Sequence, residues 1–337
     1  MAELATAWMG LALASPLVVA ASPISRDPDA AARAVEAGAG AVVMHSLFEE
    51  DLVEEQLRAH RFLDAHADMN AEASHFMPDT AAFGSGLQAY VDELGALRRR
   101  LAVPIVASLN GTSPGGWVTH AHALADAGAD AIELNLYDVP TLAVESAQDV
   151  EARQLELVAA VVNAVRVPVA VKLGPAYTAL PAFVRGLEQA GARGVTVFNR
   201  VLEPAVDLDA LAVRRGLALS SPAELPPRLH ALAVLACTCD LALACSGGVH
   251  SGADAARAIL CGAHVVQLAS VLLAHGPAHA GVVKAELAAW LDAQGYTRSA
   301  EARAVLSLDR VPDPTVWTRV NYLRSLQSWP GIPAGRR

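Results

Sequence analysis

The chain has 337 residues, of which 53% are hydrophobic and 5% aromatic, and its 35 acidic and 25 basic side chains give a net charge of −10. This length is enough for a large hydrophobic core, and the composition is typical of a globular α/β protein rather than a disordered or disulfide-stabilised one. The acidic balance argues against a general nucleic-acid surface, which needs a basic patch.

The apolar stretch at residues 9–21 could be mistaken for a signal peptide, but it lacks a basic start and contains Pro16. We expect a first strand there. No apolar run reaches the roughly 18 residues that a membrane span needs, so we expect a cytoplasmic protein without a membrane partner. The four cysteines lack the spacing of a zinc site, and we expect no metal centre but buried free thiols at Cys237, Cys239, Cys245 and Cys261.

Eight short apolar runs bounded by turn residues predict buried strands. In chain order they are Leu17–Ser22, Ala41–Ser46, Ile105–Asn110, Ala131–Leu136, Val169–Leu173, Val195–Asn199, Leu241–Ser246 and Val265–Ser270. Helical patterns between them cover Ala30–Ala37, Val118–Ala127, Ala147–Val165, Leu180–Ala190 and Ala253–Cys261. This alternation predicts an α/β fold of the (β/α)8 TIM barrel type. The alternative is an open doubly wound sheet, which is less favoured because no Gly-x-Gly-x-x-Gly follows the first strand.

A short motif recurs four times where a predicted helix meets a predicted strand. An Ala-Gly-Ala or Cys-Gly-Ala triplet precedes an apolar run at Gly38, Gly128, Gly191 and Gly262. Each fits a helix that ends in a glycine cap and is followed by a short loop and a buried strand. Repeated units of this kind indicate a parallel sheet covered by helices.

Two connections are much longer than simple loops. Nearly sixty residues follow the second strand and include an acidic helix at Glu49–His66 and a polar stretch at Met69–Gly86, and about forty follow the sixth strand. Such loops lie over the C-terminal face of a barrel, where ligands bind. We expect the barrel in residues 1–280 and a helical extension of the same domain in 281–337. The extension would have helices at Ala278–Ala293 and Ser299–Leu306 and a tail, with Trp317 and Trp329, that packs under the barrel or onto a partner subunit.

Candidates for chemistry stand at the C-terminal ends of the predicted strands. Lys172 is conspicuous because the only other lysine among the 25 basic residues is Lys284. A lysine there supplies a compact charge, either as a Schiff-base nucleophile or as a cation for an anionic ligand. Gly247-Gly248 after the seventh strand predicts a phosphate site, toward which a helix beginning near Ser251 would direct its positive end.

The sequence resembles the FMN-dependent dihydroorotate dehydrogenase superfamily over about residues 8–280. The matching segments are SPLVVAAS, IELNL, PVAVKLGP, VTVFN and SGGVHSGADAARAILCGAHVVQLASVLLAHG, and ASLNGTSPGGW is similar to a divergent, dihydroorotate dehydrogenase-like branch. The resemblance implies an FMN-dependent oxidoreductase of pyrimidine metabolism that acts on CH–CH bonds. Hydride would pass between a small, dihydropyrimidine-like substrate and flavin N5.

The resemblance also implies roles for individual residues. Lys172 would lie near the pyrimidine edge of the flavin and stabilise the reduced ring. Asn110 and Asn199 would lie on the substrate side. Ser220 is an alternative to Ser221 among the residues that would contact FMN, which are Ala21, Ser22, Ser46, Asn135, Lys172, Ser221, Gly247, Gly248, Ala269 and Ser270.

The resemblance does not extend to the residues that would remove a proton from the substrate. Family members carry an Asn-Leu-Ser-Cys-Pro-Asn-like segment with Cys or Ser as the base, but here the chain reads NLYDVP from Asn135. His45-Ser46 stands where the family has Lys before Ser or Thr, and the segment Pro78–Phe83 lacks an expected Asn. Three side chains are candidate replacements for the base: Asp138, Tyr137 and His45, whose imidazole could titrate near neutrality.

Two other functions stay open. One is a non-redox barrel lyase or isomerase that uses Lys172 as a Schiff base on a phosphorylated substrate. The other is a flavin-carrying subunit that passes electrons to a partner and has little activity alone. The expected partners are a small-molecule substrate, an electron-acceptor protein and a second copy of the chain in a homodimer, and not a nucleic acid.

Overall fold

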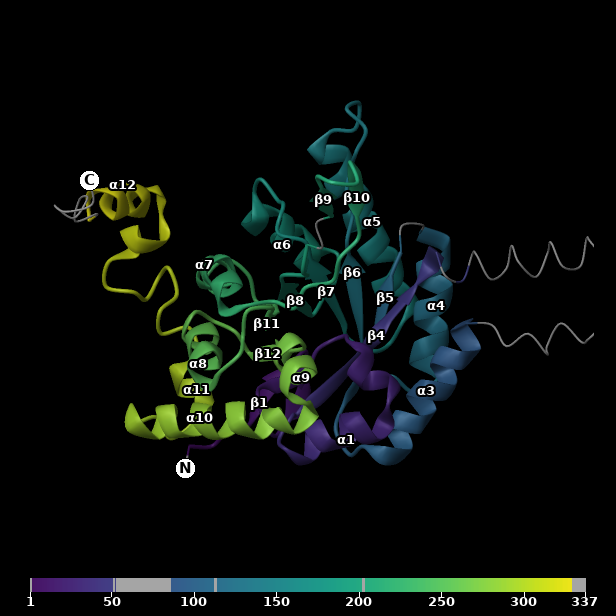
Figure 1. Cartoon of the computed structure of the whole chain (residues 1–337), viewed down its shortest axis with the longest axis horizontal. Helices are drawn as coiled ribbons and strands as arrows, with labels where there is room; N and C mark the ends of the chain where they lie inside the picture. Colours follow the sequence, from purple (N-terminus) through teal and green to yellow (C-terminus); the bar gives the residue numbers. More distant parts are fainter. Residues whose placement is uncertain (1, 51, 53–85, 112–113, 202–203, 329–337) are drawn as a thin grey trace, which may run out of the picture.

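Figure 1 shows the computed structural model of the chain, in which helices surround a barrel of strands. The structure describes residues 2–50, 52, 86–111, 114–201 and 204–328. Eight parallel strands follow each other around the barrel in the order β3-β4-β5-β6-β7-β8-β11-β12. Because β12 pairs with β3, the sheet is closed. The predicted TIM barrel is therefore confirmed, and the open doubly wound sheet is excluded.

Each barrel strand lies where an apolar run predicts it. The strands are β3 (Leu17–Val19), β4 (Ala41–Phe48), β5 (Ile105–Asn110), β6 (Ala131–Leu136), β7 (Val169–Leu173), β8 (Gly194–Val197), β11 (Ala242–Ser246) and β12 (Val265–Leu268). The bounds of β5, β6 and β7 coincide with the predicted ones, and the other strands differ by a few residues at their ends. Continuous runs of valine, isoleucine and leucine suit parallel strands that are buried on both faces.

Helices cover the outside of the barrel and continue beyond it. They are α1 (Pro28–Glu36), α3 (Gly86–Arg100), α4 (Pro114–Asp126), α5 (Ala147–Ala164), α6 (Leu180–Gln189), α7 (Leu225–Leu235), α8 (Gly252–Leu260), α9 (Ser270–His275), α10 (Ala280–Ala293), α11 (Ser299–Ala302) and α12 (Arg319–Gln327). The four repeated glycines follow α1, α4, α6 and α8 with φ between +93° and +125°. Only glycine adopts this left-handed conformation without strain, so the motif ends each helix as predicted.

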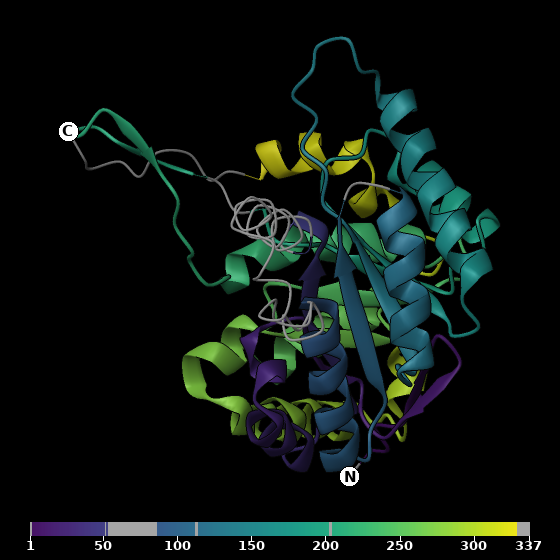
Figure 2. The same ribbon diagram turned by 90° about the vertical axis from the view of Figure 1, so that its right-hand side faces the viewer.

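Two antiparallel hairpins lie outside the barrel, and neither was predicted. The apolar stretch 9–21 holds β2 (Leu11–Leu13) as well as β3, and β2 pairs with β1 (Thr6–Trp8). The side chains of Trp8 and Leu13 are buried against the interior of the barrel, so this hairpin closes the N-terminal end. The second hairpin, β9 (Ala205–Asp207) with β10 (Ala212–Arg214), lies in the long connection after β8. It projects from the body as the teal-green arm in Figure 2.

Side chains inside the barrel change from apolar to polar along its axis. Near the N-terminal end they are small and apolar, among them Val18, Val106, Ala131 and Val265. Two residues further along their strands, polar side chains face the same interior, because alternate residues share a face. These buried polar residues include Ser108, Glu133, Lys172, Thr196 and Gln267. The polar end is the C-terminal end, where the sequence places the candidate residues.

The C-terminal extension continues from the barrel as α10, α11 and α12. The α11 helix is shorter than predicted and ends at Ala302, and Ala304 has a positive φ of 61°. The Trp317 indole donates a hydrogen bond to the carbonyl of Leu306 (3.0 Å), and His230 on α7 contacts the carbonyl of Trp317 (3.0 Å). Trp317 therefore packs against the flank of the barrel at α7, and not under the barrel, which was one of the two predicted places.

Some predictions fall outside the described residues: the helix Glu49–His66 beyond Leu52, the stretch Met69–Gly86 before Gly86, the segment Pro78–Phe83, and Trp329. In the described part of the chain no helix is long and apolar enough to cross a membrane, and no cluster of potential metal ligands occurs. The cysteines are free thiols, with Cys245 and Cys261 buried. The expectation of burial is wrong for Cys237, which is exposed.

Candidate active site

A pocket opens at the C-terminal mouth of the barrel around the ends of five strands. Residues that end or follow β3, β7, β8, β11 and β12 line it, together with Ser220 from the long connection after β8. The predicted site residues that it brings together are Ala21, Lys172, Asn199, Gly247, Gly248, Ala269 and Ser270. The barrel closure therefore gathers side chains that are up to about 250 positions apart in the sequence, as the fold class requires.

Lys172 lines this pocket, and its ammonium group is paired with a buried carboxylate. Its Nζ lies 3.7 Å from Oε1 of Glu133, and the exposed fractions of the two side chains are 7% and 0%. The other carboxylate oxygen of Glu133 accepts hydrogen bonds from Thr196 Oγ1 (3.0 Å) and Gln267 Nε2 (2.6 Å). These donors come from β8 and β12, so three strands fix the carboxylate under the lysine. A buried charge held by this many partners has little freedom to move.

Three asparagines extend the polar surface next to Lys172. In the strand register Asn135 pairs with Lys172 on one side and with Asn110 on the other. The Asn199 amide donates to Oδ1 of Asn135 (3.0 Å), and the main-chain N–H of Arg200 donates to Oδ1 of Asn199 (2.9 Å). The two amide side chains therefore have assigned orientations, and Asn110, Asn135, Asn199 and Lys172 form one polar side of the mouth.

On the neighbouring strand, which pairs with β8, the chain turns sharply after β11 at Gly247 and Gly248. Both glycines have positive φ, +89° and +77°. A Cβ on Gly247 would lie 2.7 Å from the guanidinium of Arg228, and one on Gly248 would lie 2.6 Å from the main-chain nitrogen of Leu225. The turn needs glycine for both its conformation and its space, and it brings backbone close to the pocket as a phosphate-binding turn does.

Arg228 lies behind this turn and was not predicted. Its side chain is 8% exposed and lies 3.8 Å from the carboxylate of Glu224, and it also donates to the carbonyls of Ser246 and Glu224. Burial lowers the pKa of Arg228 from its ordinary value. The guanidinium adds positive charge under the glycine turn, which favours an anionic group above it.

Of the two candidate serines before α7, Ser220 lines the pocket and Ser221 does not. The main-chain N–H of Ser220 donates to Ser270 Oγ (2.9 Å), and Ser220 Oγ accepts from the main-chain N–H of Gly248 (3.4 Å). Ser221 is exposed and caps the turn that precedes α7, with Glu224 as its partner. The structure therefore favours Ser220 over the predicted Ser221 as a ligand contact.

The expectation that a helix beginning near Ser251 directs its positive end at a phosphate is wrong. That helix is α8, and its N-terminal amides already have acidic partners. Asp254 accepts from the main-chain N–H groups of His250 and Ser251 (both 3.1 Å), and Glu286 accepts from that of Gly252 (2.7 Å). Two carboxylates therefore neutralise this helix end, as capping groups do.

A bulge in β4 turns His45 away from the mouth. Val43 pairs with Val106 and Ser46 with Ser108, so β4 contains one residue more than β5 between these pairs. As a result Ser46 Oγ faces Ser108 Oγ (2.9 Å), whereas the His45 ring packs on Tyr90 of α3 and its Nδ1 lies 3.5 Å from Glu93. Burial and the charge of Arg26 lower the pKa of His45 to about 4, and the expected titration near neutrality is therefore wrong.

Asp138 and Tyr137 line a separate, neighbouring pocket beside the mouth. This pocket has a volume of about 260 Å³ and also contains Gly111, Arg153 and Gln154. The Asp138 carboxylate lies 2.8 Å from the Arg153 guanidinium on α5. Asp138 is thus close to the mouth but paired with an arginine, and the residues that line the Lys172 pocket do not include it.

Three buried oxygen atoms in or just after the barrel strands lack a hydrogen-bond partner among the described residues. One is Oε1 of Glu133, which faces the ammonium group of Lys172 at 3.7 Å. The other two are Oγ of Ser22 and Oε1 of Gln267, and both residues are less than 7% exposed. Buried polar atoms are nearly always paired, so these atoms suit a polar ligand. Together with Lys172, the asparagines and the glycine turn, they fit a ligand that has a polar ring at one end and a phosphate at the other.

The charged and polar residues that support this pocket were not predicted from the sequence. Glu133 had one visible signal, since it is an acidic residue inside the apolar run AIELNL. Thr196 and Gln267 lie in similar runs but are uncharged, and Arg228 lies in a helix, where arginine is common. Only the closure of the barrel shows that these side chains meet.

Comparison with known proteins gives a consistent family. The sequence model described as dihydroorotate dehydrogenase matches residues 3–291. The catalytic subunit of dihydroorotate dehydrogenase B (NAD(+)) from Methanosarcina acetivorans is 29% identical over 294 residues, which cover 86% of this chain and 91% of that protein. The protein of the same name from Pyrococcus abyssi is 26% identical over 301 residues, or 86% of this chain and 94% of that protein.

A third relative matches more closely over a shorter stretch. It comes from Aeropyrum pernix, and its name provisionally assigns it as a dihydroorotate dehydrogenase A (fumarate). It is 35% identical over 186 residues, which cover 52% of this chain and 58% of that protein. The chain thus spans little more than half of this relative but most of the two preceding ones.

Proposed function

Since the chain belongs to the dihydroorotate dehydrogenase family, we propose that it is an FMN-dependent oxidoreductase acting on a CH–CH bond. The observation that carries this proposal is the pocket in which Lys172, Asn199 and the Gly247-Gly248 turn meet at the mouth of the barrel. When bound, FMN supplies a ring that accepts or donates hydride at N5.

The described residues fit this cofactor. The glycine turn and Ser270 would hold the phosphate, with the Arg228 charge behind them, and Ala21 would lie against the ring. Lys172 would place its positive charge next to the polar edge of the flavin ring. Glu133 holds the ammonium group of Lys172 in position. The unpaired oxygens of Ser22 and Gln267 are suited to polar edges of the cofactor. These residues bind and orient, and Lys172 counters negative charge that develops above it.

The substrate is proposed to be a small dihydropyrimidine-like compound other than dihydroorotate. The chain lacks the Cys or Ser base of the family, and its two best alternatives have other partners. Asp138 is paired with Arg153, and His45 faces α3. Asn110 and Asn199 would contact the substrate. Asp138 and Tyr137 remain as candidates to remove a proton, since both line the neighbouring pocket beside that mouth, and Asp138 is the one proposed here.

A partner protein is part of the proposal. Two of the relatives are named as catalytic subunits, which implies that those proteins work with another subunit. We infer that this chain also passes electrons to an acceptor protein. Its activity with small acceptors alone would then be low.

The visible spectrum of the purified protein tests the cofactor assignment. A yellow protein with one FMN per chain is expected, either as isolated or after reconstitution. A colourless protein that takes up no FMN would overturn the proposal, and trapping of a carbonyl substrate on Lys172 by borohydride would instead assign the Schiff-base lyase. Anaerobic titration with dihydroorotate tests the substrate. Rapid bleaching of the flavin would contradict a different substrate while leaving the flavin assignment intact.

A further inference from the structure

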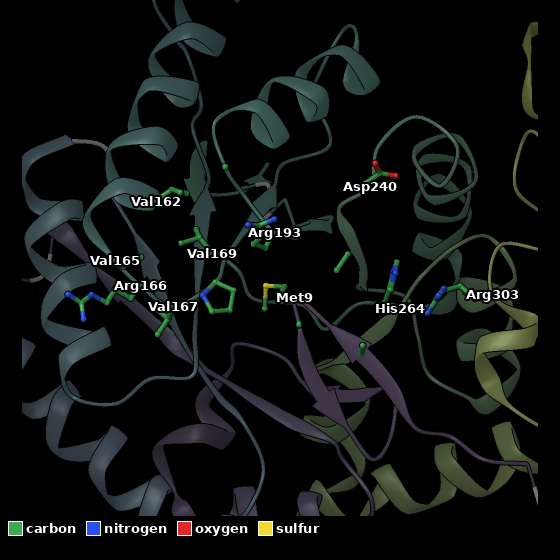
Figure 3. Close-up of a pocket in the computed structure, with 15 residues that line it drawn as sticks. Met9, Val162, Val165, Arg166, Val167, Val169, Arg193, Asp240, His264 and Arg303 are labelled. Carbon is green, nitrogen blue, oxygen red and sulfur yellow. The ribbon is translucent and has the colours of Figure 1, made fainter.

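A second cavity opens at the opposite, N-terminal end of the barrel (Figure 3). It has a volume of about 700 Å³ and lies beside the β1–β2 hairpin. Residues that line it come from the loops before β7, β8, β11 and β12, and from the segment after α11. Neither the predicted site residues nor the Lys172 pocket share a residue with it.

The cavity is rich in arginine although the chain is acidic. Arg166, Arg193 and Arg303 line it, whereas Asp240 is its only lining acid among the described residues. Ten other arginines of the described part form ion pairs with carboxylates. The three cavity arginines are among the nine arginines of that part of the chain for which no ion pair occurs. Three unpaired guanidinium groups around one hollow favour an anion.

The side chains of Arg303 and His264 lie together at one end of the cavity. Figure 3 shows the Arg303 side chain directed toward His264, with Arg193 and Met9 nearer the centre. Arg166 lies at the far rim, where its guanidinium is turned outward. Arg193 and Arg166 are exposed, whereas Arg303 is half-buried. The inner anion contacts would therefore come from Arg193, Arg303 and His264, and Arg166 would contribute at longer range.

His264 has a hydrogen-bond donor available for a ligand. The main-chain N–H of Leu243 donates to its Nδ1 (3.0 Å), so the neutral ring carries its proton on Nε2. Burial and the charge of Arg303 lower the pKa of His264 to about 4. Burial and the charge of Arg310 also lower the pKa of Arg303. In both cases burial is the larger cause, and the neighbouring arginine acts in the same direction.

Apart from Asp240, the remaining lining residues are apolar or glycine, and they give the cavity a second property. Val162, Val165, Val167 and Val169 form one wall, and the side chain of Met9 lies between this wall and His264. A bare inorganic ion would leave these surfaces in contact with water. An organic molecule with one charged end would cover them and gain from apolar burial.

We propose that this cavity binds a small organic oxyanion, a phosphate ester or a polycarboxylate, with Arg193 and Arg303 as its anion ligands. The site is independent of the proposed function, because it lies at the other end of the barrel. The N–H of His264 donates to the same anion, and the valine wall contacts its apolar part.

Isothermal titration of the purified full-length protein with pyrophosphate and with citrate, at low ionic strength, tests this site. Saturable binding of one anion per chain is expected. Arg193→Ala and Arg303→Ala should each weaken it at least about tenfold, since each removes hydrogen bonds from a charged group. The control Arg215→Ala removes the same charge from the exposed segment after β10 and should change the affinity less than about twofold. Tighter binding of pyrophosphate assigns a phosphate ester, and tighter binding of citrate a polycarboxylate.

Protection from chemical modification gives a second measurement that needs no variant. Phenylglyoxal should modify Arg193 more slowly when the bound anion is present, as read by peptide mass spectrometry, whereas the modification of Arg215 should be unaffected. The proposal is overturned if neither anion binds saturably, or if binding survives both arginine substitutions. It is also overturned if Arg215→Ala weakens binding as much as they do, since the effect would then be general charge.

Discussion

The ammonium group of Lys172 lies 3.7 Å from the carboxylate of Glu133, inside a barrel where their side chains are 7% and 0% exposed. An ion pair in such a place is costly to form, because both charges lose water. Thr196 and Gln267 offset part of this cost through their hydrogen bonds to Glu133. The ion pair is therefore explained by the role of Lys172 at the mouth of the barrel rather than by a contribution to the stability of the fold.

Replacement of Glu133 should reveal this cost directly. Glu133→Ala leaves Lys172 buried without its partner and should lower the free energy of unfolding by about 3–5 kcal/mol. Glu133→Gln keeps an oxygen for Thr196 and Gln267 and should lose less. Urea unfolding followed by circular dichroism measures both. Glu156→Gln, an exposed site on α5, is the control and should change the value by no more than about 0.5 kcal/mol.

Removal of the lysine charge should weaken flavin binding. Lys172→Met keeps most of the side-chain length, and the loss of a charged hydrogen-bond donor should reduce FMN affinity by roughly tenfold or more. The bound fraction can be read from the flavin absorbance after dialysis. Lys284→Met on α10, the same substitution at the other lysine, should keep the parent FMN content. Equal FMN affinity in Lys172→Met would remove the role assigned to this residue.

The glycine turn offers a sharp test of the phosphate site. A Cβ at Gly248 would lie 2.6 Å from the main-chain nitrogen of Leu225, whereas one at Gly276 would meet nothing within 4 Å, although both residues have positive φ. Gly276→Ala should therefore cost only the backbone strain of its positive-φ, extended conformation (φ 88°, ψ 157°), about 1–3 kcal/mol. Gly248→Ala should cost more and should also lower FMN affinity. Urea unfolding and flavin absorbance measure the two effects, and similar results for both variants would contradict the close packing.

Buried histidines should make the protein less stable in mild acid. The pKa of His45 and that of His264 are lowered to about 4 in the folded chain, against about 6.5 in the unfolded chain. Below pH 6.5 the unfolded state therefore binds more protons, so the free energy of unfolding should fall as the pH drops from 6.5 toward 4.

The quantity to measure is the slope of the unfolding free energy against pH. His45→Gln should reduce the decrease in unfolding free energy between pH 6.5 and pH 4.5, as followed by urea unfolding. Between pH 7.5 and pH 8.5 both histidines are neutral in either state, so the variant and the parent should there show the same slope. An unchanged slope in the acid range would mean that His45 is not buried as described.

Asp138 should matter for turnover rather than for cofactor binding. Asp138→Asn removes the carboxylate and should lower the rate of flavin reduction by about 10²–10⁴-fold if this group moves the proton. FMN content should stay at the parent level, since Asp138 lies outside the Lys172 pocket. Arg153→Gln removes the partner but keeps the carboxylate, so it separates loss of the ion pair from loss of the base. A full reduction rate in Asp138→Asn, with any active substrate, would exclude the assignment.

Local patterns were sufficient to predict the barrel, because each strand and helix has its own signal. Apolar runs predicted β5, β6 and β7 to the residue, and the glycine motif predicted where four helices end. The β1–β2 hairpin was missed because its strands merge with the apolar run that leads into β3. The β9–β10 arm was missed because its strands are only three residues long and almost fully exposed, so they form no apolar run.

The candidate site was predictable where a residue type is rare or geometrically special. Lys172 was visible through scarcity, and Gly247-Gly248 through its place after a strand. Glu133 and Arg228 were not, since their roles depend on contacts between elements far apart in the sequence. The orientation of His45 was also inaccessible, because one extra residue in β4 decides it and leaves no mark in the sequence pattern.

That extra residue in β4 has a wider consequence. Without it, His45 would pair with Ser108 and direct an imidazole into the barrel, and Ser46 would face α3. A shift of this bulge along β4 can thus exchange a hydroxyl for an ionisable ring at the same place, with the sequence of the strand unchanged. New chemistry on this scaffold can therefore evolve through a register shift within one strand. A comparison of aligned residues, one position at a time, does not detect such a shift.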